Sequence, residues 1–189
     1  MITADHIRSS IKESIEVRSS IQPREVEKAT NLILSSLKKK GKVLIFGNGG
    51  SASDAQHFAA ELMVRFKNNR RSLPAIALTT DTSIITACSN DFNFSKIFER
   101  QIESLANKND VAIGISTSGN SENVVLAIKK AKEKSLKAIT LTGKDGGKLN
   151  NLADITIKIP SNNTARIQET HITILHIICE LIDKEFENG

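Results

Sequence analysis

The sequence predicts an α/β protein, a three-layer α-β-α sandwich around a five-stranded parallel sheet, with two extra N-terminal helices and a long C-terminal helix. Segments with a helical spacing of apolar residues alternate with short apolar runs. These runs lie at 43–46, 74–78, 110–115, 138–141 and 155–159. Strands that alternate with helices in this way form parallel sheets covered on both faces. The loops that follow such strands are expected to carry the site.

Length and composition predict a single domain over residues 1–189, with a helical extension at 1–40 and an α/β core at 41–189. The chain is 39% apolar and 25% charged, as ordinary globular proteins are. No apolar run reaches the roughly 18–20 residues of a membrane span, and the first residues lack the pattern of a secretory signal. The two cysteines suggest no disulfide framework. We therefore expect a cytoplasmic protein with no membrane partner.

The net charge of +5 makes nucleic acid a partner to consider. The lysines are scattered, however, and the runs at 38–40 and 129–130 fall late in expected helices, where cations suit the helix dipole. Tyrosine and tryptophan are absent, so stacking platforms for bases would be few. A solvated basic surface is expected, with no nucleic-acid partner.

Two helices are expected before the first strand. Isoleucines at near-helical spacing predict a helix over 5–20, and Pro23 fits the first turn of a second helix that ends at Gly41. Leading helices of this kind can cover the sheet or pack against another subunit. The thin apolar stripe of the first helix favours the second use in part.

The stretch 43–50 predicts a short buried strand and a tight Gly-Asn-Gly-Gly turn, after which Ser51 or Ser53 can cap a helix. On that helix, His57 and Glu61 lie four residues apart and project from one face. A helix that starts at a glycine turn is a good anion site, because its free N–H groups and positive dipole end point outward. An imidazole and a carboxylate follow this cradle within two turns.

The later elements are expected in a regular order. After the second strand, Asp81 or Thr82 can cap a short helix through Cys88, and the residues 89–91 break it. The elements after the break are a helix at 94–106, a strand at 110–115, a helix at 122–134, a strand at 138–141, a short helix to about 151, a strand at 155–159 and a long apolar helix at 164–187.

The glycine turn also matches a relaxed dinucleotide-binding pattern, Gly47-x-Gly49-x-x-Ala52. Such a match is weak by itself. A dinucleotide site also needs an acidic residue at the end of the second strand, and the nearest candidate, Asp81, lies three residues beyond it. A nucleotide cofactor is therefore disfavoured.

The loop 116–121, Ser-Thr-Ser-Gly-Asn-Ser, carries four hydroxyls in six residues at a helix start. One serine would be enough to cap the helix. Four hydroxyls and flexible backbone N–H groups favour a phosphate held by neutral donors.

On the last helix, His176 among isoleucines is either a satisfied core residue or an active-site group. The pair of His57 and Glu61 is, by itself, more often a surface contact.

Six motifs spread over the whole chain form a specific joint pattern. They are Gly-Asn-Gly-Gly-Ser-Ala at 47–52, His57 with Glu61, Asn-Asp at 90–91, Ser-Thr-Ser-Gly-Asn-Ser at 116–121, Leu-Thr-Gly-Lys-Asp-Gly-Gly at 141–147 and Arg-Ile-Gln-Glu at 166–169. Together they resemble the phosphoheptose isomerases of the sugar isomerase (SIS) domain superfamily. The resemblance implies a flavodoxin-like SIS fold. In one departure, Ala165 stands where some relatives carry an aspartate.

The resemblance implies that the chain converts sedoheptulose 7-phosphate to D-glycero-D-manno-heptose 7-phosphate, the first step of nucleotide-heptose synthesis for lipopolysaccharide or capsule. It also implies one zinc ion per subunit and a homotetramer with active sites at subunit interfaces. The alternative is a non-catalytic SIS-fold regulator that binds a phosphosugar or the replication initiator protein. A pure binder would have no chemical reason to keep Glu61, Gln168 and His176, so the enzyme is favoured.

Individual roles follow from the resemblance. The residues implied to hold the phosphate are Ser116, Thr117, Ser118 and Ser121. The other substrate contacts implied are Asn48, Gly49, Gly50, Ser51, Glu61, Asn90, Asp91 and Gln168. The implied metal ligands are His57, Glu61, Gln168 and His176, with Glu61 and His176 also the catalytic pair.

Aldose–ketose isomerisation moves a proton between adjacent carbons through an enediol(ate), which needs a base and an acid. We assign Glu61 as the base and His176 as the acid. Eight residues separate Gln168 from His176, a rise of about 12 Å on a straight helix. The two side chains can barely reach one ion over that span. We therefore expect either an irregular start to the last helix or a site completed by a neighbouring subunit.

Overall fold

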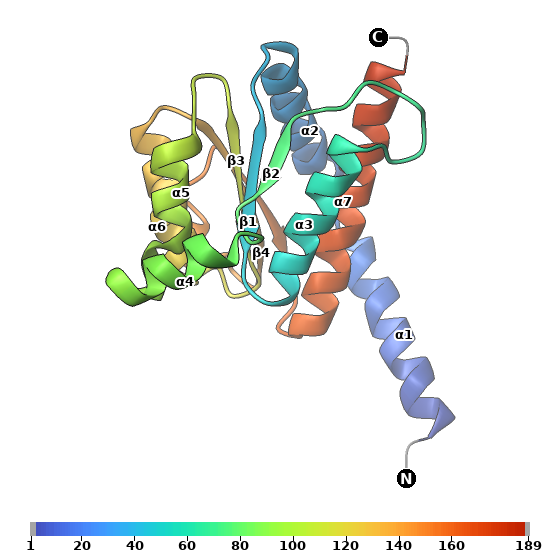
Figure 1. Cartoon of the computed structure of the whole chain (residues 1–189). Helices are drawn as coiled ribbons and strands as arrows, with labels where there is room; N and C mark the ends of the chain where they lie inside the picture. Colours follow the sequence, from blue (N-terminus) through green and yellow to red (C-terminus); the bar gives the residue numbers. More distant parts are fainter. Residues whose placement is uncertain (1–2, 188–189) are drawn as a thin grey trace.

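The computed structural model describes residues 3–187 and confirms the three-layer sandwich (Figure 1). All five strands are parallel and lie in the order β2-β1-β3-β4-β5. Their bounds are Val43–Gly47 for β1, Ala75–Ala77 for β2, Val111–Ser116 for β3, Lys137–Gly143 for β4 and Ile155–Ile159 for β5. The expected domain bounds at 1–189 stay a prediction, because residues 1–2 and 188–189 lie outside the described residues.

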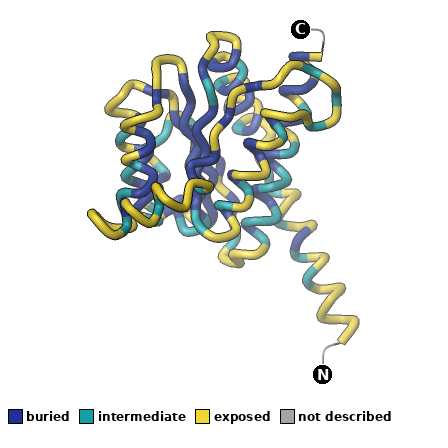
Figure 2. The backbone as a smooth tube through the Cα atoms, viewed as in Figure 1, coloured by how far each residue is buried: buried dark blue, intermediate teal, exposed yellow. Residues whose placement is uncertain are grey.

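Helices cover both faces of the sheet, and each face has its own apolar core. One face is covered by α2 (Pro23–Lys38), α3 (Gly50–Met63) and α7 (Thr164–Phe186), and the other by α4 (Thr82–Asp91), α5 (Ile97–Leu105) and α6 (Glu122–Glu133). Short 3-10 turns lie at Phe94–Lys96 and Gly147–Leu149. Successive strand side chains point to opposite faces, so Val43 joins the first core and Leu44 the second. Figure 2 shows the buried strands between the two helical layers.

Helix α1 (Ala4–Ser19) extends away from the sandwich and packs mainly on α7 (Figure 1). Its contacts with α7 include the bond from Ser14 Oγ to Glu169 Oε2 at 2.6 Å and the bond from Arg166 Nη1 to Ser10 O at 2.8 Å. The side of α1 that bears Ile7, Ile11 and Ile15 is uncovered, and each isoleucine is 55% exposed. No helix within residues 3–187 is long and apolar enough to cross a membrane.

Three expectations about element ends are wrong. Neither Ser51 nor Ser53 caps α3, because Gly49 adopts a positive φ of 56° and closes the turn itself. Helix α4 begins after Asp81 as expected but continues through Asp91, since asparagine and aspartate cost a helix little. The last helix is regular from Thr164 onward, so an irregular start does not explain the separation of its two polar residues.

Candidate active site

The order of the strands places two polar loops side by side. Strand β1 pairs with β2 on one side and β3 on the other, so the chain reverses direction across the sheet at the β1–β3 boundary. Ligands of open α/β sheets bind at the carboxyl edge beside this reversal. Gly47 pairs with Ile115 in the register of the two strands. The glycine turn and the serine loop therefore begin next to each other.

A pair of amides joins these two loops. Asn48 Nδ2 donates to Asn123 Oδ1 at 2.9 Å, and Asn123 Nδ2 donates to Asn48 Oδ1 at 2.8 Å. Asn123 is 3% exposed and lies in the first turn of α6. Sequence reasoning missed this residue, because no local pattern marks a partner 75 positions away. The amide pair orients the expected substrate residue Asn48 toward α6.

The hydroxyls of the serine loop converge at the N-terminus of α6. Ser116 Oγ lies 2.9 Å from Ser121 Oγ and 3.4 Å from Ser118 Oγ. Ser121 is the N-cap residue of α6, but its side chain makes no capping bond, and in the first turn Asn123 Oδ1 accepts from Val124 N at 2.9 Å. The hydroxyls thus bond one another and leave the positive end of the helix open to an anion. The carbonyl of Thr117 points elsewhere and accepts from Gly143 N at 3.1 Å.

Helices α3 and α7 lie side by side and run in the same direction (Figure 1). At one end, a Cβ atom on Gly50 would lie 2.5 Å from Gln168 Nε2, so the glutamine amide packs against the glycine backbone. Further along both helices, His57 Nε2 lies 3.4 Å from His176 Nε2. The two contacts are about two helical turns apart on each helix. Gln168 and His176 therefore face different parts of α3.

Three of the expected site residues meet between these helices. His57 Nε2 lies 3.0 Å from Glu61 Oε1 on the next turn of α3, and the rings of His57 and His176 meet edge to face at 4.9 Å between centroids. On its other side, His176 stacks on Phe66 at 5.5 Å. The side chains of His57 and Glu61 are 46% and 23% exposed, so the cluster is open to a small molecule.

The surroundings of His176 keep its imidazole neutral at pH 7. Burial lowers the pKa of His176, and the neighbouring His57 lowers it further, while Glu61 acts in the opposite direction. A neutral imidazole can donate one proton and can also bind a metal ion. The carboxylate and the imidazole needed for isomerisation are thus available on one side of α3.

Asp54, which sequence reasoning missed, lies on the same face of α3, one turn before His57. Burial raises the pKa of its carboxyl to about 6, against the opposing effect of His57. Its Oδ2 atom is buried and has no hydrogen-bond partner within the described residues. Its spacing of three and seven residues from His57 and Glu61 was a signal that sequence analysis had available.

Asn90 and Asp91 are not brought to this cluster within one chain. They end α4 on the opposite face of the sheet, where both are exposed and Asn90 Nδ2 donates to Asp91 Oδ1 at 2.9 Å. Ser51 is buried in the first turn of α3, and Gly49 is open to solvent. A contact between Asn90 or Asp91 and a substrate at His57 would therefore need a second subunit.

The donors at the cluster fit zinc in kind, because two imidazoles and a carboxylate are usual zinc ligands. Within residues 3–187, however, no group of three or more His, Cys, Asp or Glu side chains is arranged to hold a metal ion. His57 Nε2 instead faces both Glu61 and His176. Gln168, the fourth expected ligand, lies about two turns away at Gly50.

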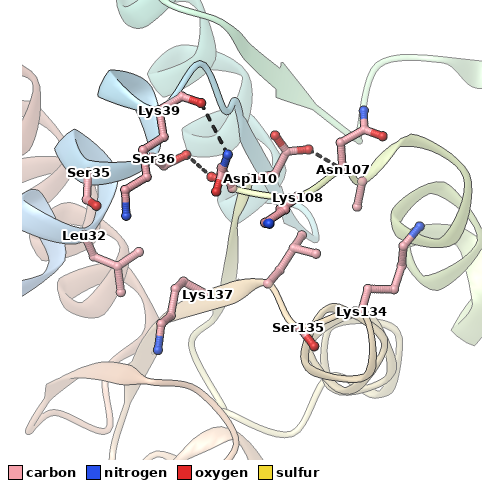
Figure 3. Close-up of a pocket in the computed structure, with 13 residues that line it drawn as sticks. Leu32, Ser35, Ser36, Lys39, Asn107, Lys108, Asp110, Lys134, Ser135 and Lys137 are labelled. Atoms are coloured by element: carbon pink, nitrogen blue, oxygen red, sulfur yellow. Dashed lines mark hydrogen bonds between the residues drawn. The ribbon is translucent and has the colours of Figure 1, made fainter.

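Two cavities mark opposite edges of the sheet. One, of about 630 Å³, lies at the carboxyl edge and is lined by Asn48, Asn93, Phe94, Ser95, Ser121, Glu122 and Asn123. The other, of about 660 Å³, lies at the amino edge among Lys39, Lys108, Lys134 and Lys137 (Figure 3). Two of these lysines are already engaged, since Lys134 Nζ donates to Glu103 O and Lys137 Nζ pairs with Asp154. The cavity at the carboxyl edge is the one lined by two of the expected substrate residues, Asn48 and Ser121.

Comparison with known proteins identifies the family of this chain. The family model of the SIS domain matches residues 7–143, which defines the class to which the fold and the site belong. A phosphoheptose isomerase of Aliarcobacter butzleri is 56% identical over 163 residues, 86% of each chain. The chain belongs to the phosphoheptose isomerase family of SIS domain proteins.

Two solved structures match almost the whole chain. The phosphoheptose isomerase GmhA from Neisseria gonorrhoeae is 43% identical, with a TM-score of 0.90 over 95% of this chain and 98% of that one. A phosphoheptose isomerase from Francisella tularensis is 41% identical, with a TM-score of 0.93 over 97% and 100% of the two chains. These matches confirm the expected family and fold.

Proposed function

We propose that this chain isomerises sedoheptulose 7-phosphate to D-glycero-D-manno-heptose 7-phosphate. Membership of the phosphoheptose isomerase family supports the reaction. The observation that carries the site assignment is the meeting of His57, Glu61 and His176 between two parallel helices, in the same chain as a serine loop suited to phosphate. A regulator that only binds a phosphosugar would not need a carboxylate and a neutral imidazole together.

In the proposed reaction, Glu61 removes a proton from C1 of the ketose while His176 donates a proton to the C2 carbonyl oxygen. The enediol(ate) that forms then receives the proton from Glu61 at C2. The O1 hydroxyl returns a proton to His176 as the aldehyde forms at C1. Each group ends the cycle in its starting state, so a single pair of residues is enough.

The phosphate is proposed to bind at the N-terminus of α6, with Ser116, Thr117, Ser118 and Ser121 around it. The converging hydroxyls and the open helix end supply neutral donors there. The glycine turn and Asn48 would then line the carbon chain between the phosphate and Glu61. This arrangement uses the carboxyl edge of the sheet from β3 to α3.

We propose that the side chains of His57, Glu61 and His176, which contact one another and would have to turn toward a common ion, hold one zinc ion per subunit, with Gln168 as a further ligand or substrate contact. Bound zinc would polarise the sugar oxygens. Elemental analysis of purified protein should give one equivalent of zinc, and a chelator should lower the thermal midpoint. His57→Ala should remove both effects, whereas His6→Ala, on α1, should remove neither. Metal-free wild type with full activity would contradict the proposal.

We propose a homotetramer with active sites at subunit interfaces. The uncovered isoleucine stripe of α1, the separation of Gln168 from His176, and the distant position of Asp91 support this. Mixing Glu61→Gln chains with Asp91→Asn chains should restore activity if one site takes the two residues from different subunits. A mixture no more active than either parent, despite exchange of subunits, would show that each chain builds its own site.

The direct test is incubation with sedoheptulose 7-phosphate, with and without chelator, followed by detection of the aldose phosphate. Folded wild-type protein that gives no product under either condition would contradict the proposed function.

We further propose that the protein acts in the cytoplasm. The buried free cysteines Cys88 and Cys179 suit a reducing compartment, and phosphosugar intermediates are made there.

A further inference from the structure

Arg70 and Asp183 form a buried ion pair between the loop 64–73 and helix α7. Their side chains are 0% and 1% exposed, and Arg70 Nε lies 2.6 Å from Asp183 Oδ1. A buried ion pair contributes little net stability compared with apolar residues of similar volume, because both charges lose their hydration. Stability alone is therefore a poor explanation for this pair.

The remaining donors of Arg70 bind the end of α3. Nη2 donates to the carbonyl of Glu61 at 2.8 Å, and Nη1 donates to the carbonyl of Leu62 at 2.9 Å. Carbonyls in the last turn of a helix have no partner within the helix. Arg70 therefore ties the backbone of the assigned base to Asp183 on α7.

The second oxygen of Asp183 fastens the loop that covers His176. It accepts from Lys67 N at 2.7 Å and from Asn68 N at 2.9 Å, directly after Phe66, whose ring stacks on His176. Asp183 lies seven residues after His176, two turns along α7. The carboxylate of Asp183 thus holds Arg70, which binds the backbone of Glu61, and also the loop whose Phe66 ring stacks on His176.

We propose that Arg70 and Asp183 are positioning residues that set the spacing of α3 and α7 at the active site. This inference rests on the proposed roles of Glu61 and His176. Neither residue touches the substrate, and both act through the backbone of Glu61 and through Phe66. Their effect should therefore fall on kcat, which depends on the alignment of acid and base, more than on binding at the serine loop.

The amino edge of the sheet offers a matched control. Asp110 is 3% exposed, pairs with Lys42 Nζ at 2.6 Å, and accepts from Lys42 N at 2.9 Å and from Asn107 N at 2.8 Å. It is thus a buried carboxylate with one cation and two backbone donors, as Asp183 is. It differs from Asp183 in its distance from the cluster and in its partner, because the side chain of Lys42 is 19% exposed and that of Arg70 is 0% exposed.

The experiment compares two double variants, Arg70→Met with Asp183→Leu, and Lys42→Met with Asp110→Leu. Apolar replacement of both partners avoids a lone buried charge and often preserves stability. The first variant should lose at least about tenfold in kcat with KM changed less than about twofold, and the second should stay within about twofold of wild type in both. Wild-type kcat in the first variant, or an equal loss in the two, would overturn the proposal.

If the first double variant fails to fold, the single variants Asp183→Asn and Asp110→Asn are compared in place of the two double variants. Each is assayed at the same number of degrees below its own thermal midpoint. Only Asp183→Asn should lower kcat, and equal kcat in the two overturns the proposal. A wild type without activity would contradict the proposed function instead. The inference is then tested by a crystal structure of the first variant that folds. An unchanged separation of His57 and His176, 3.4 Å between Nε2 atoms, would overturn it.

Discussion

The two edges of the sheet differ in how completely their polar groups are satisfied. At the amino edge, Asp110 and Asp154 each accept from lysine ammonium and backbone donors, and burial of Asp154 is outweighed by these bonds, so its pKa is about 2. At the carboxyl edge, Asp54 keeps a buried oxygen without a partner in the described chain, and the serine hydroxyls bond one another and two N–H groups of their own loop.

This difference distinguishes polar groups that already bond other parts of the protein from polar groups that remain free to bind a ligand. Both edges have a cavity, and the amino edge also has the lysines, but several of its charged groups are already bonded to residues of neighbouring loops and strands. The carboxyl edge has weaker charge, yet its donors and acceptors converge and remain available. Cavity volume does not distinguish the two edges, and the availability of the polar groups favours the carboxyl edge.

The largest expected effect on activity comes from substituting Glu61 at the carboxyl edge. Glu61→Gln keeps the shape of the side chain but removes the base, so kcat should fall by about 10²–10⁴-fold, while the thermal midpoint measured with chelator present should stay close to that of wild type with chelator. Asp110→Asn at the amino edge should do the reverse and lower the midpoint while kcat stays near wild type. Steady-state kinetics and thermal unfolding of both variants measure the contrast. Full activity of Glu61→Gln would refute the assignment of the base.

A second test compares the KM values of two serine variants, one at each edge of the sheet. Ser116→Ala removes a hydroxyl from the phosphate loop, and the loss of one hydrogen bond to a charged group should raise KM by about tenfold. Ser36→Ala removes a buried hydroxyl that donates to Asn109 O at 2.6 Å at the amino edge. Its KM should equal that of wild type. Equal KM values for the two variants would place the phosphate elsewhere.

A third test measures how the stability of the fold depends on pH through the buried His171. His171 is buried on α7, and burial lowers its pKa to about 4, against the bond to the Thr142 carbonyl. The unfolded chain takes up this proton near pH 6.5 and the folded chain does not, so stability falls as pH drops from 6.5 to about 4. The loss is at most about 3 kcal/mol. Asp154, with its lowered pKa, contributes stability above about pH 4 and loses it only below that.

Urea unfolding of wild type at pH 7 and pH 5 measures this loss together with the opposite contribution of Asp54, whose raised pKa of about 6 adds stability as the pH falls. In His171→Gln, the difference between the two pH values should shrink, although the variant is less stable at both. In Asp154→Asn, the difference should match that of wild type, because Asp154 stays ionised at pH 5. An unchanged difference in His171→Gln would mean that another group titrates.

The smallest expected effect is at the amino-edge cavity. Lys39→Glu and Lys108→Glu reverse charges that line it, yet neither residue lies near the substrate path (Figure 3). Both kcat and KM should stay within about twofold of wild type, since surface charges at this distance are largely screened. A larger change in KM would show that phosphosugars also bind at this edge.

Sequence patterns predicted most of the fold because each element carries a local signal. Apolar runs marked the five strands, and Asp81 marked the start of α4. Local signals failed where backbone geometry decided, as at Gly49, whose positive φ replaced the expected serine cap, and at Asp91, which continued the helix. The motif at His57 and Glu61 was visible because both residues lie on one helix.

By itself the sequence determined the α/β class, the two polar loops and the residue types needed for isomerisation, since these follow from periodicity and motifs within short stretches. Only the tertiary structure decided that His176 joins His57 while Gln168 does not, that Asn123 holds Asn48, and that Arg70 binds both Glu61 and Asp183. Such contacts join residues up to 119 positions apart. They depend on how α3, α6 and α7 pack on the sheet, and no local pattern records that packing.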